Sequence, residues 1–196
     1  MKNLILISIS LFFIAGCSTT PHPTGAEIGP RISFGEYTKR MNAKTKSDKR
    51  YNGFYQLYET HVTFIDSDVQ SLVLQRKSDV YQWDQDKAQK EREKMFQENS
   101  SASKFFLVLF TPNKKLTDLH RGNSIWKLYL DVNGDRYEAK IKKMQGPLAN
   151  TKAIYPSTNR FSQPYEVSFN VPTNTIEDNS AKFILTSALG TTELNF

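Results

Sequence analysis

Residues 125–142 read Ile-Trp-Lys-Leu-Tyr-Leu-Asp-Val-Asn-Gly-Asp-Arg-Tyr-Glu-Ala-Lys-Ile-Lys, with alternating apolar and polar side chains on both sides of Asn133-Gly134. Asn-Gly supplies the two positive-φ residues of a type I′ turn, so the stretch predicts a β-hairpin. The turn sets the facing pairs on the apolar side: Leu130 with Tyr137, Leu128 with Ala139, and Trp126 with Ile141. One apolar and one polar face are typical of an antiparallel sheet that covers a core on one side.

The rest of the chain from residue 51 adds five further predicted strands. They cover residues 54–65, 105–110, 165–171, 182–188 and 191–196. Residues 105–110 (Phe-Phe-Leu-Val-Leu-Phe) form an uninterrupted apolar run before Thr111-Pro112, which predicts a central strand buried on both faces. About seven short strands favour a mainly β fold, an antiparallel β-sandwich with a helical insertion at about 67–98.

The insertion begins with a helix start signal. Ser67 and Gln70 have capping-box spacing, and an apolar stripe with helical period runs from Val69 to Trp83. Beyond Trp83 the stripe is lost, so either the helix breaks near Ser78-Asp79, with Asp79 as a new N-cap, or it leaves the body of the domain. The charged stretch 84–98 is either a projecting arm for a partner or a surface helix that packs Met95 and Phe96 on the sheet.

The N-terminus has the pattern of a secretory signal peptide: Lys2 precedes a short apolar run from Leu4 to Ala15. As a helix this run reaches about 18 Å, against roughly 30 Å of membrane hydrocarbon. Ile14-Ala15-Gly16-Cys17 follows and resembles the lipobox of bacterial lipoproteins. The resemblance implies cleavage after Gly16 and lipidation of Cys17, the single cysteine of the chain, with acyl chains of the palmitate type as a lipid anchor.

The same resemblance implies a location in the bacterial cell envelope. Ser18 rather than Asp follows the lipidated position, which favours the outer membrane, with the domain in the periplasm or exposed at the surface. The chain has 26 basic and 20 acidic side chains; loss of Lys2 with the signal peptide leaves 25 and 20, a net charge of +5. The expected partners are therefore the membrane, through the lipid on Cys17, and an envelope protein complex or peptidoglycan, but no nucleic acid.

Three domain segments follow from this pattern: a lipoprotein signal peptide at 1–16, the lipidated Cys with a flexible basic tether at 17–50, and the β-sandwich domain at 51–196. Residues 18–30 are rich in Ser, Thr, Pro and Gly, which is typical of a linker. Residues 39–50 carry six basic side chains and one acid, Asp48, and either lie on an anionic membrane or form a solvated segment.

Candidate chemistry is sparse. The three histidines have no metal-ligand spacing, so we expect no metal and no cofactor. Asp118, His120 and Ser124 lie close in sequence and are the weak catalytic candidates if the protein is an enzyme, but a polar loop accounts for them equally well. Four aromatic residues in and just before the first predicted strand form either a sugar-stacking platform or core contacts: Tyr51, Phe54, Tyr55 and Tyr58.

The mature domain loosely resembles uncharacterised proteobacterial lipoproteins, through Tyr51-Asn52-Gly53-Phe54, the charged helix and the strand with Ser124-Ile125-Trp126. This resemblance implies no activity. The expected function is that of a lipid-anchored, noncatalytic interaction or assembly module at the outer membrane. The alternatives are a cell-wall or glycan-active hydrolase or glycan-binding protein, and an accessory lipoprotein of a secretion or motility complex.

Overall fold

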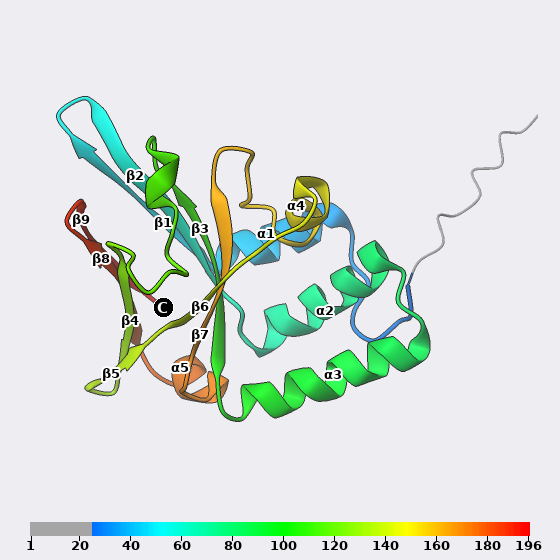
Figure 1. Ribbon diagram of the computed structural model, residues 1–196. Coiled ribbons are helices and arrows are strands. Elements are labelled where there is room, and N and C mark those ends of the chain that lie inside the picture. The colour runs from blue at the N-terminus through cyan, green and yellow to red at the C-terminus, as the bar shows by residue number, and fades with distance from the viewer. Residues whose placement is uncertain (1–24) are drawn as a thin grey trace, which may run out of the picture.

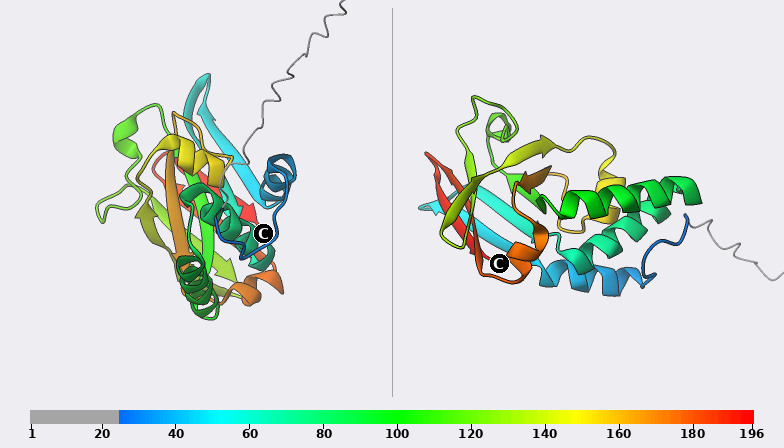
Figure 2. Two further views of the ribbon diagram at one scale, coloured as in Figure 1. Left: turned by 90° about the vertical axis from the view of Figure 1, so that its right-hand side faces the viewer. Right: turned by 90° about the horizontal axis from the view of Figure 1, so that it is seen from below.

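The computed structural model describes residues 25–196 as two antiparallel sheets and a layer of helices (Figure 1). The larger sheet lies in the middle. One of its faces packs on the smaller sheet and the other is covered by helices, so that the β-sandwich has a third layer (Figures 1 and 2). The mainly β fold and the helical insertion are as the sequence predicts, although the structure has nine strands rather than seven.

The larger sheet has the strand order β1-β2-β3-β7-β6. Its strands are β1 (Thr45–Asn52), β2 (Tyr55–Phe64), β3 (Ser103–Phe110), β7 (Gln163–Phe169) and β6 (Lys140–Lys143). The apolar run 105–110 is the central strand of the five, as predicted. Its alternation explains why the run is apolar throughout, since Phe105 and Leu107 face the second sheet while Phe106 and Val108 face the helices.

The smaller sheet has the order β5-β4-β8-β9. Its strands are β4 (Lys127–Val132), β5 (Asp135–Glu138), β8 (Ala181–Ser187) and β9 (Gly190–Asn195). The Asn133-Gly134 hairpin is confirmed, because both residues have positive φ and Leu130 pairs with Tyr137. The predicted pairing of Trp126 with Ile141 is wrong: after Ala139 the chain crosses to the larger sheet, where Ile141 pairs with Val167.

The helical layer consists of α1 (Phe34–Ala43), α2 (Ser67–Tyr81), α3 (Gln85–Asn99) and α4 (Leu148–Ile154), while the short η1 (Lys114–Leu116) and α5 (Thr173–Glu177) lie in connections. A second core of apolar side chains from α1, α2, α4 and β3 joins this layer to the larger sheet. The helix predicted near Ser67 is confirmed, but the predicted capping box of Ser67 and Gln70 is wrong. Asp66 is the N-cap, and its carboxylate accepts the Val69 N–H at 2.9 Å.

The break between α2 and α3 lies later than predicted. Asp79 stays inside α2, Gln82 adopts a left-handed conformation, and Asp84 caps α3 by accepting the Lys87 N–H at 2.7 Å. Ala88 is the one buried residue of α3, and Phe96 is 59% exposed, so the prediction that Phe96 packs on the sheet is wrong. The helix lies along the domain with little of its surface buried.

The predicted tether at 17–50 extends too far into the domain. Residues 34–43 form α1 and residues 45–52 form β1, the edge strand of the larger sheet. Charged side chains dominate β1 because an edge strand has one neighbour and is exposed to solvent. The lysines and arginines that gave this segment the composition of a linker therefore belong to a folded strand; Cys17 and residues 18–24 lie outside the described residues.

Candidate functional site

Three aromatic side chains gather at the tip of the β1–β2 hairpin, and none of them contributes to the core. Tyr51 is 56% exposed, Tyr55 is 81% exposed, and Phe54 is exposed completely, at 103%. Gly53 has a φ of 58°, which suits the first central position of the two-residue turn Gly53-Phe54. We call Tyr51, Phe54 and Tyr55 the aromatic tip. A single exposed aromatic residue is common on protein surfaces, whereas a cluster of exposed aromatic residues is typical of an interaction surface.

The base of this hairpin is fixed to the second sheet. Tyr58, the fourth aromatic residue of the segment, is completely buried; its hydroxyl shares a hydrogen bond of 2.9 Å with Thr192 of β9. Thr192 in turn donates to the Asp48 carboxylate of β1 at 2.6 Å, and Arg50 lies 2.7 Å from the same carboxylate. Tyr58 therefore packs in the core, which was one of the two interpretations of these aromatic residues from the sequence, while the other three are exposed.

A cluster of charges lies along the hairpin below the aromatic tip. Glu59 accepts hydrogen bonds from Gln56 at 3.1 Å and His61 at 2.9 Å, and Lys49 lies 3.2 Å away. Burial alone would raise the pKa of Glu59, but these hydrogen bonds and the Lys49 charge lower it below its ordinary value. The carboxylate stays ionised and holds the polar face of the hairpin in one arrangement.

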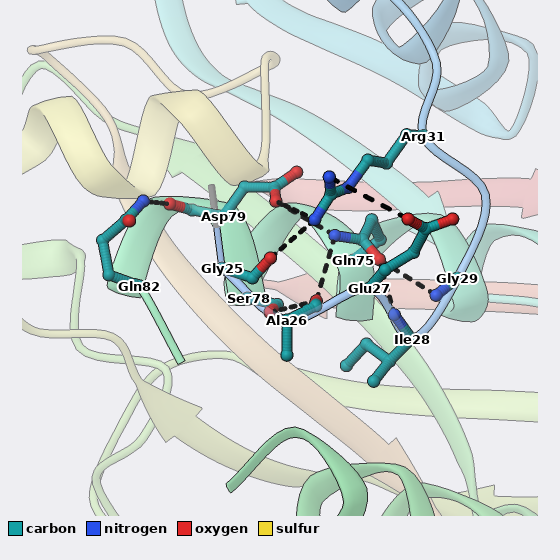
Figure 3. Close-up of polar contacts among 10 residues, drawn as sticks. All are labelled: Gly25, Ala26, Glu27, Ile28, Gly29, Arg31, Gln75, Ser78, Asp79 and Gln82. Carbon is teal, nitrogen blue, oxygen red and sulfur yellow. Dashed lines mark hydrogen bonds and ion pairs between the residues drawn. The ribbon is translucent and has the colours of Figure 1, made fainter. Parts of the chain in front are cut away.

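The N-terminal segment 25–31 is fastened to the C-terminal half of α2 (Figure 3). The Gln75 side chain, 2% exposed, accepts hydrogen bonds from the backbone N–H groups of Ile28 at 2.8 Å and Gly29 at 3.0 Å. The Ser78 hydroxyl donates to the Ala26 carbonyl at 2.7 Å, and the Ala26 N–H donates to the Trp83 carbonyl at 2.8 Å. We call this set of contacts the N-terminal clamp.

Two further features tighten the clamp. Arg31 donates to the Gly25 carbonyl at 2.6 Å and lies 3.8 Å from the Asp79 carboxylate, which closes the segment into a loop against α2 (Figure 3). Gly25 itself is buried, and a Cβ there would lie 1.9 Å from the Ser78 carbonyl oxygen. The backbone approaches α2 so closely that glycine is the one residue that fits.

The aromatic tip and the N-terminal clamp lie at opposite ends of the domain. In Figure 1 the β1–β2 hairpin extends at the upper left, whereas the described chain begins beside the α2–α3 turn at the right. The right-hand view in Figure 2 shows the same separation. At the clamp end, Tyr81 and Trp83 stack with ring centroids 6.4 Å apart, and the Lys87 ammonium lies 5.9 Å from the Trp83 ring. Any attachment through the N-terminus would leave the aromatic tip pointing away from it.

The structure does not assemble the weak catalytic candidates into a triad. Ser124 donates to Asp118 at 2.8 Å and accepts the Trp126 N–H at 3.2 Å, so these two side chains shape a loop. His120 is exposed, with its ring 6.2 Å from that of Tyr165. It lines a shallow surface pocket with Lys142 and Glu166, which neither Asp118 nor Ser124 reaches. His120 makes no hydrogen bond with the Ser124 hydroxyl, so the three side chains do not form a Ser-His-Asp arrangement.

Residues 25–196 contain no group of three or more His, Cys, Asp or Glu side chains placed to hold a metal ion. Within the same range, no helix has both the length and the apolar character that a membrane crossing requires.

Comparisons with protein-family models, with curated proteins and with solved structures found no match to this chain. The sequence pointed to the aromatic residues of the tip but not to their exposure, because Tyr and Phe in a strand are equally typical of a core. The N-terminal clamp gave no sequence signal, since a Gly-Pro-rich segment is also typical of a linker.

Proposed function

We propose that this protein is a noncatalytic interaction module of the bacterial cell envelope, held at the outer membrane by lipid on Cys17 and binding a partner protein through the aromatic tip. The observation that carries the proposal is the complete exposure of Phe54 between two exposed tyrosines. Aromatic side chains and arginine dominate the binding energy of protein interfaces. Arg50 precedes Tyr51 in the chain, and its guanidinium pairs with Asp48. A strand edge at β1 offers additional backbone groups to a partner.

The N-terminal clamp supports a definite orientation for the anchored protein. From Cys17 to Gly25 there are eight Cα–Cα steps, which at about 3.3–3.6 Å each span at most about 26–29 Å. A lipid on Cys17 would thus hold the clamp end of the domain near the bilayer. Tyr81, Trp83 and Lys87 lie at that end, and residues of these types favour the membrane–water interface. The aromatic tip then faces away from the membrane that holds the anchor.

The lipid anchor has a direct test. Wild-type protein recovered from the membrane fraction should carry a diacylglyceryl group and an acyl chain on Cys17, measured as the mass of the N-terminal peptide. A Cys17→Ser variant should lose that mass and leave the membrane fraction. If the wild-type N-terminal peptide carries no added lipid mass and Cys17→Ser stays in the membrane fraction as the wild type does, Cys17 is not lipidated and the anchor is excluded.

The partner site is tested by chemical crosslinking in intact cells followed by mass spectrometry. We expect one recurring protein partner with the wild type, at least tenfold less of it with Phe54→Ser, and no change with Phe96→Ser. Phe96 is the matched control because it is also an exposed phenylalanine, on α3 rather than the hairpin. Equal recovery from both variants would rule out the aromatic tip as the partner site.

Glycan binding is the second candidate, because exposed tyrosine rings also suit sugar stacking. It has its own measurement: binding of the protein to purified peptidoglycan, compared between Phe54→Ser and Phe96→Ser. Loss of peptidoglycan binding in Phe54→Ser alone, with no protein adduct in cells, would replace the protein partner by a glycan. The hydrolase hypothesis has no support in the contacts of Asp118, His120 and Ser124.

A further inference from the structure

A cavity of about 510 Å³ lies between the larger sheet and the helices α2 and α3, on the side of the sheet formed by β3, β7 and β6. It exists because α3 buries one residue, Ala88, and so does not close against the sheet. The volume falls within the range of small-molecule binding sites, about 300–1,000 Å³. Neither the aromatic tip nor the N-terminal clamp contributes to it apart from Trp83, so it is a separate feature of the domain.

The floor of this cavity is apolar. The rings of Phe106 and Tyr155 stack face to face there, with centroids 3.9 Å apart and an angle of 4° between their planes. Leu74 contributes from α2 and Met95 from the half-buried side of α3. Phe106 and Tyr155 are 1% and 5% exposed, so an apolar body would contact these rings over a small area and the half-buried Met95 over a larger one.

The rim is charged, with a surplus of lysine. Five lysines and three glutamates line the cavity: Lys77, Lys94, Lys104, Lys140, Lys142, Glu91, Glu98 and Glu166. We call this cavity the lysine groove.

Two of the glutamates in the lysine groove are already neutralised. Lys104 and Lys94 both pair with Glu98, and Glu91 pairs with Lys87. The hydrogen bond from Lys87, with the charges of Lys94 and Lys77, lowers the pKa of Glu91, so it stays ionised.

Three lysines of the rim make no ion pair within 4 Å among the described residues, although the charge of Lys77 acts on Glu91 and Lys142 lies opposite Glu166 in the β6–β7 pairing. They are Lys77 on α2 and the edge-strand residues Lys140 and Lys142 of β6. Lys140 and Lys142 lie two positions apart on one strand, so both side chains stand on the face of the sheet that borders the groove. Glu91 and Glu166 compensate Lys77 and Lys142 in part, so the rim keeps a surplus of two lysines over glutamates above an apolar floor.

We propose that the lysine groove binds a single-chain amphiphile with a carboxylate head, of the fatty-acid class. The chain lies on Phe106, Tyr155 and Met95, and the carboxylate meets the ammonium groups of Lys140 and Lys142. Charge complementarity selects an anion, since a neutral chain leaves the lysines without a partner and a cation is repelled by them. This inference depends neither on the lipid anchor nor on the aromatic tip.

The test uses the Cys17→Ser chain, which has no site for a lipid of its own, and decanoate as the probe. Calorimetric titration should show saturable binding of decanoate and at least tenfold weaker binding of decanol, which has the same chain without charge. Lys140→Gln with Lys142→Gln should weaken decanoate binding about 3- to 30-fold, as expected for two partly exposed charge pairs. Methyl signals of Leu74 and Met95 should shift on binding.

A second variant and a matched control complete the design. Ser168 lines the groove on β7 beside Lys140, and Ser168→Phe should fill the space and abolish binding. Lys115→Gln with Lys127→Gln removes two exposed lysines that do not line the groove and should leave binding unchanged. The proposal is overturned if decanoate does not bind, if decanol binds equally, or if the Lys140/Lys142 variant keeps wild-type affinity; should Ser168→Phe not fold, that lysine comparison decides alone.

Discussion

Substitution of Gln75 by leucine should open the N-terminal clamp without unfolding the domain. The amide oxygen of Gln75 accepts the N–H groups of both Ile28 and Gly29, at 2.8 and 3.0 Å, and the side chain is 2% exposed. Leucine has a similar size but no acceptor, so both N–H groups lose their partner while the packing volume is kept. Residues 25–31 should then leave the surface of α2 more often.

The magnitude follows mainly from the two hydrogen bonds that Gln75 accepts, because its third contact with the segment, from the amide N–H to the Ala26 carbonyl, is longer at 3.3 Å. Each contributes about 0.5–1.5 kcal/mol, so together the loss is about 1–3 kcal/mol of local opening free energy. Since 1.4 kcal/mol is a factor of ten, hydrogen exchange at the Ile28 and Gly29 amides should become about 5- to 150-fold faster. Exchange at Val108, in the centre of β3, should stay close to the wild-type rate because the core is untouched.

The assay is amide hydrogen exchange measured residue by residue by NMR. Gln89→Leu is the matched control, because Gln89 is an exposed glutamine on α3 that does not contact residues 25–31. Gly25→Ala is a second perturbation of the same clamp, since its Cβ would meet the Ser78 carbonyl at 1.9 Å. Wild-type protection of Ile28 and Gly29 in Gln75→Leu would refute the clamp, and an equal loss of protection at Val108 would show global destabilisation instead.

Three other predictions concern stability and charge. Thr192→Val should lower the free energy of unfolding by about 1–3 kcal/mol, because it leaves the completely buried Tyr58 hydroxyl without a partner. Tyr58→Phe should lower it less, by about 0.5–1.5 kcal/mol, and urea unfolding of both variants checks this order. Burial raises the pKa of Tyr37 well above its ordinary value of 10.0, so the stability that the protonated hydroxyl contributes is present below pH 10.0 and is lost as the pH rises further. The urea midpoint should therefore fall less steeply at alkaline pH in Tyr37→Phe than in the wild type. An unchanged dependence of the midpoint on pH would exclude Tyr37 as a cause. The hydrogen bonds from Arg136 lower the pKa of Asp131, so the stability contributed by the Asp131 carboxylate is present above the unfolded-state pKa and is lost as the pH falls through the lower folded-state pKa. In Arg136→Gln the pKa of Asp131, measured by NMR titration, should return toward its ordinary value. An unchanged pKa would argue against the ion pair.

The sequence predicted the sheets better than the edges of the domain. The Asn133-Gly134 turn and the run 105–110 were recognised because turn chemistry and two-sided burial leave strong local patterns. The crossing from β5 to β6 left no such pattern, because residues 135–142 alternate as one strand would. The separation into two sheets depends on partners more than 20 positions away, such as Val167 for Ile141. The sequence pattern therefore placed Ile141 opposite Trp126.

The candidate site shows the same limit. A basic segment before the first predicted strand was interpreted as a tether, yet it contains β1, because an exposed edge strand has the composition of a linker. Tyr51, Phe54, Tyr55 and Tyr58 have similar side chains, and their separation into three exposed residues and one buried residue is set by the hairpin extending beyond β3 and β9. The lysine groove combines residues from five elements that lie far apart in the sequence, so no local sequence pattern predicts it.

The central claim is that the lipid-anchored protein presents the aromatic tip away from its membrane to a partner protein. Photo-crosslinking in intact cells tests it most directly, with the photoreactive amino acid placed at position 54 in the tip or at position 81 beside the clamp. The account predicts a discrete protein adduct from position 54, adducts with lipid from position 81, and loss of both in Cys17→Ser. Lipid adducts from position 54 with protein adducts from position 81, or the same adducts from both positions, would contradict it.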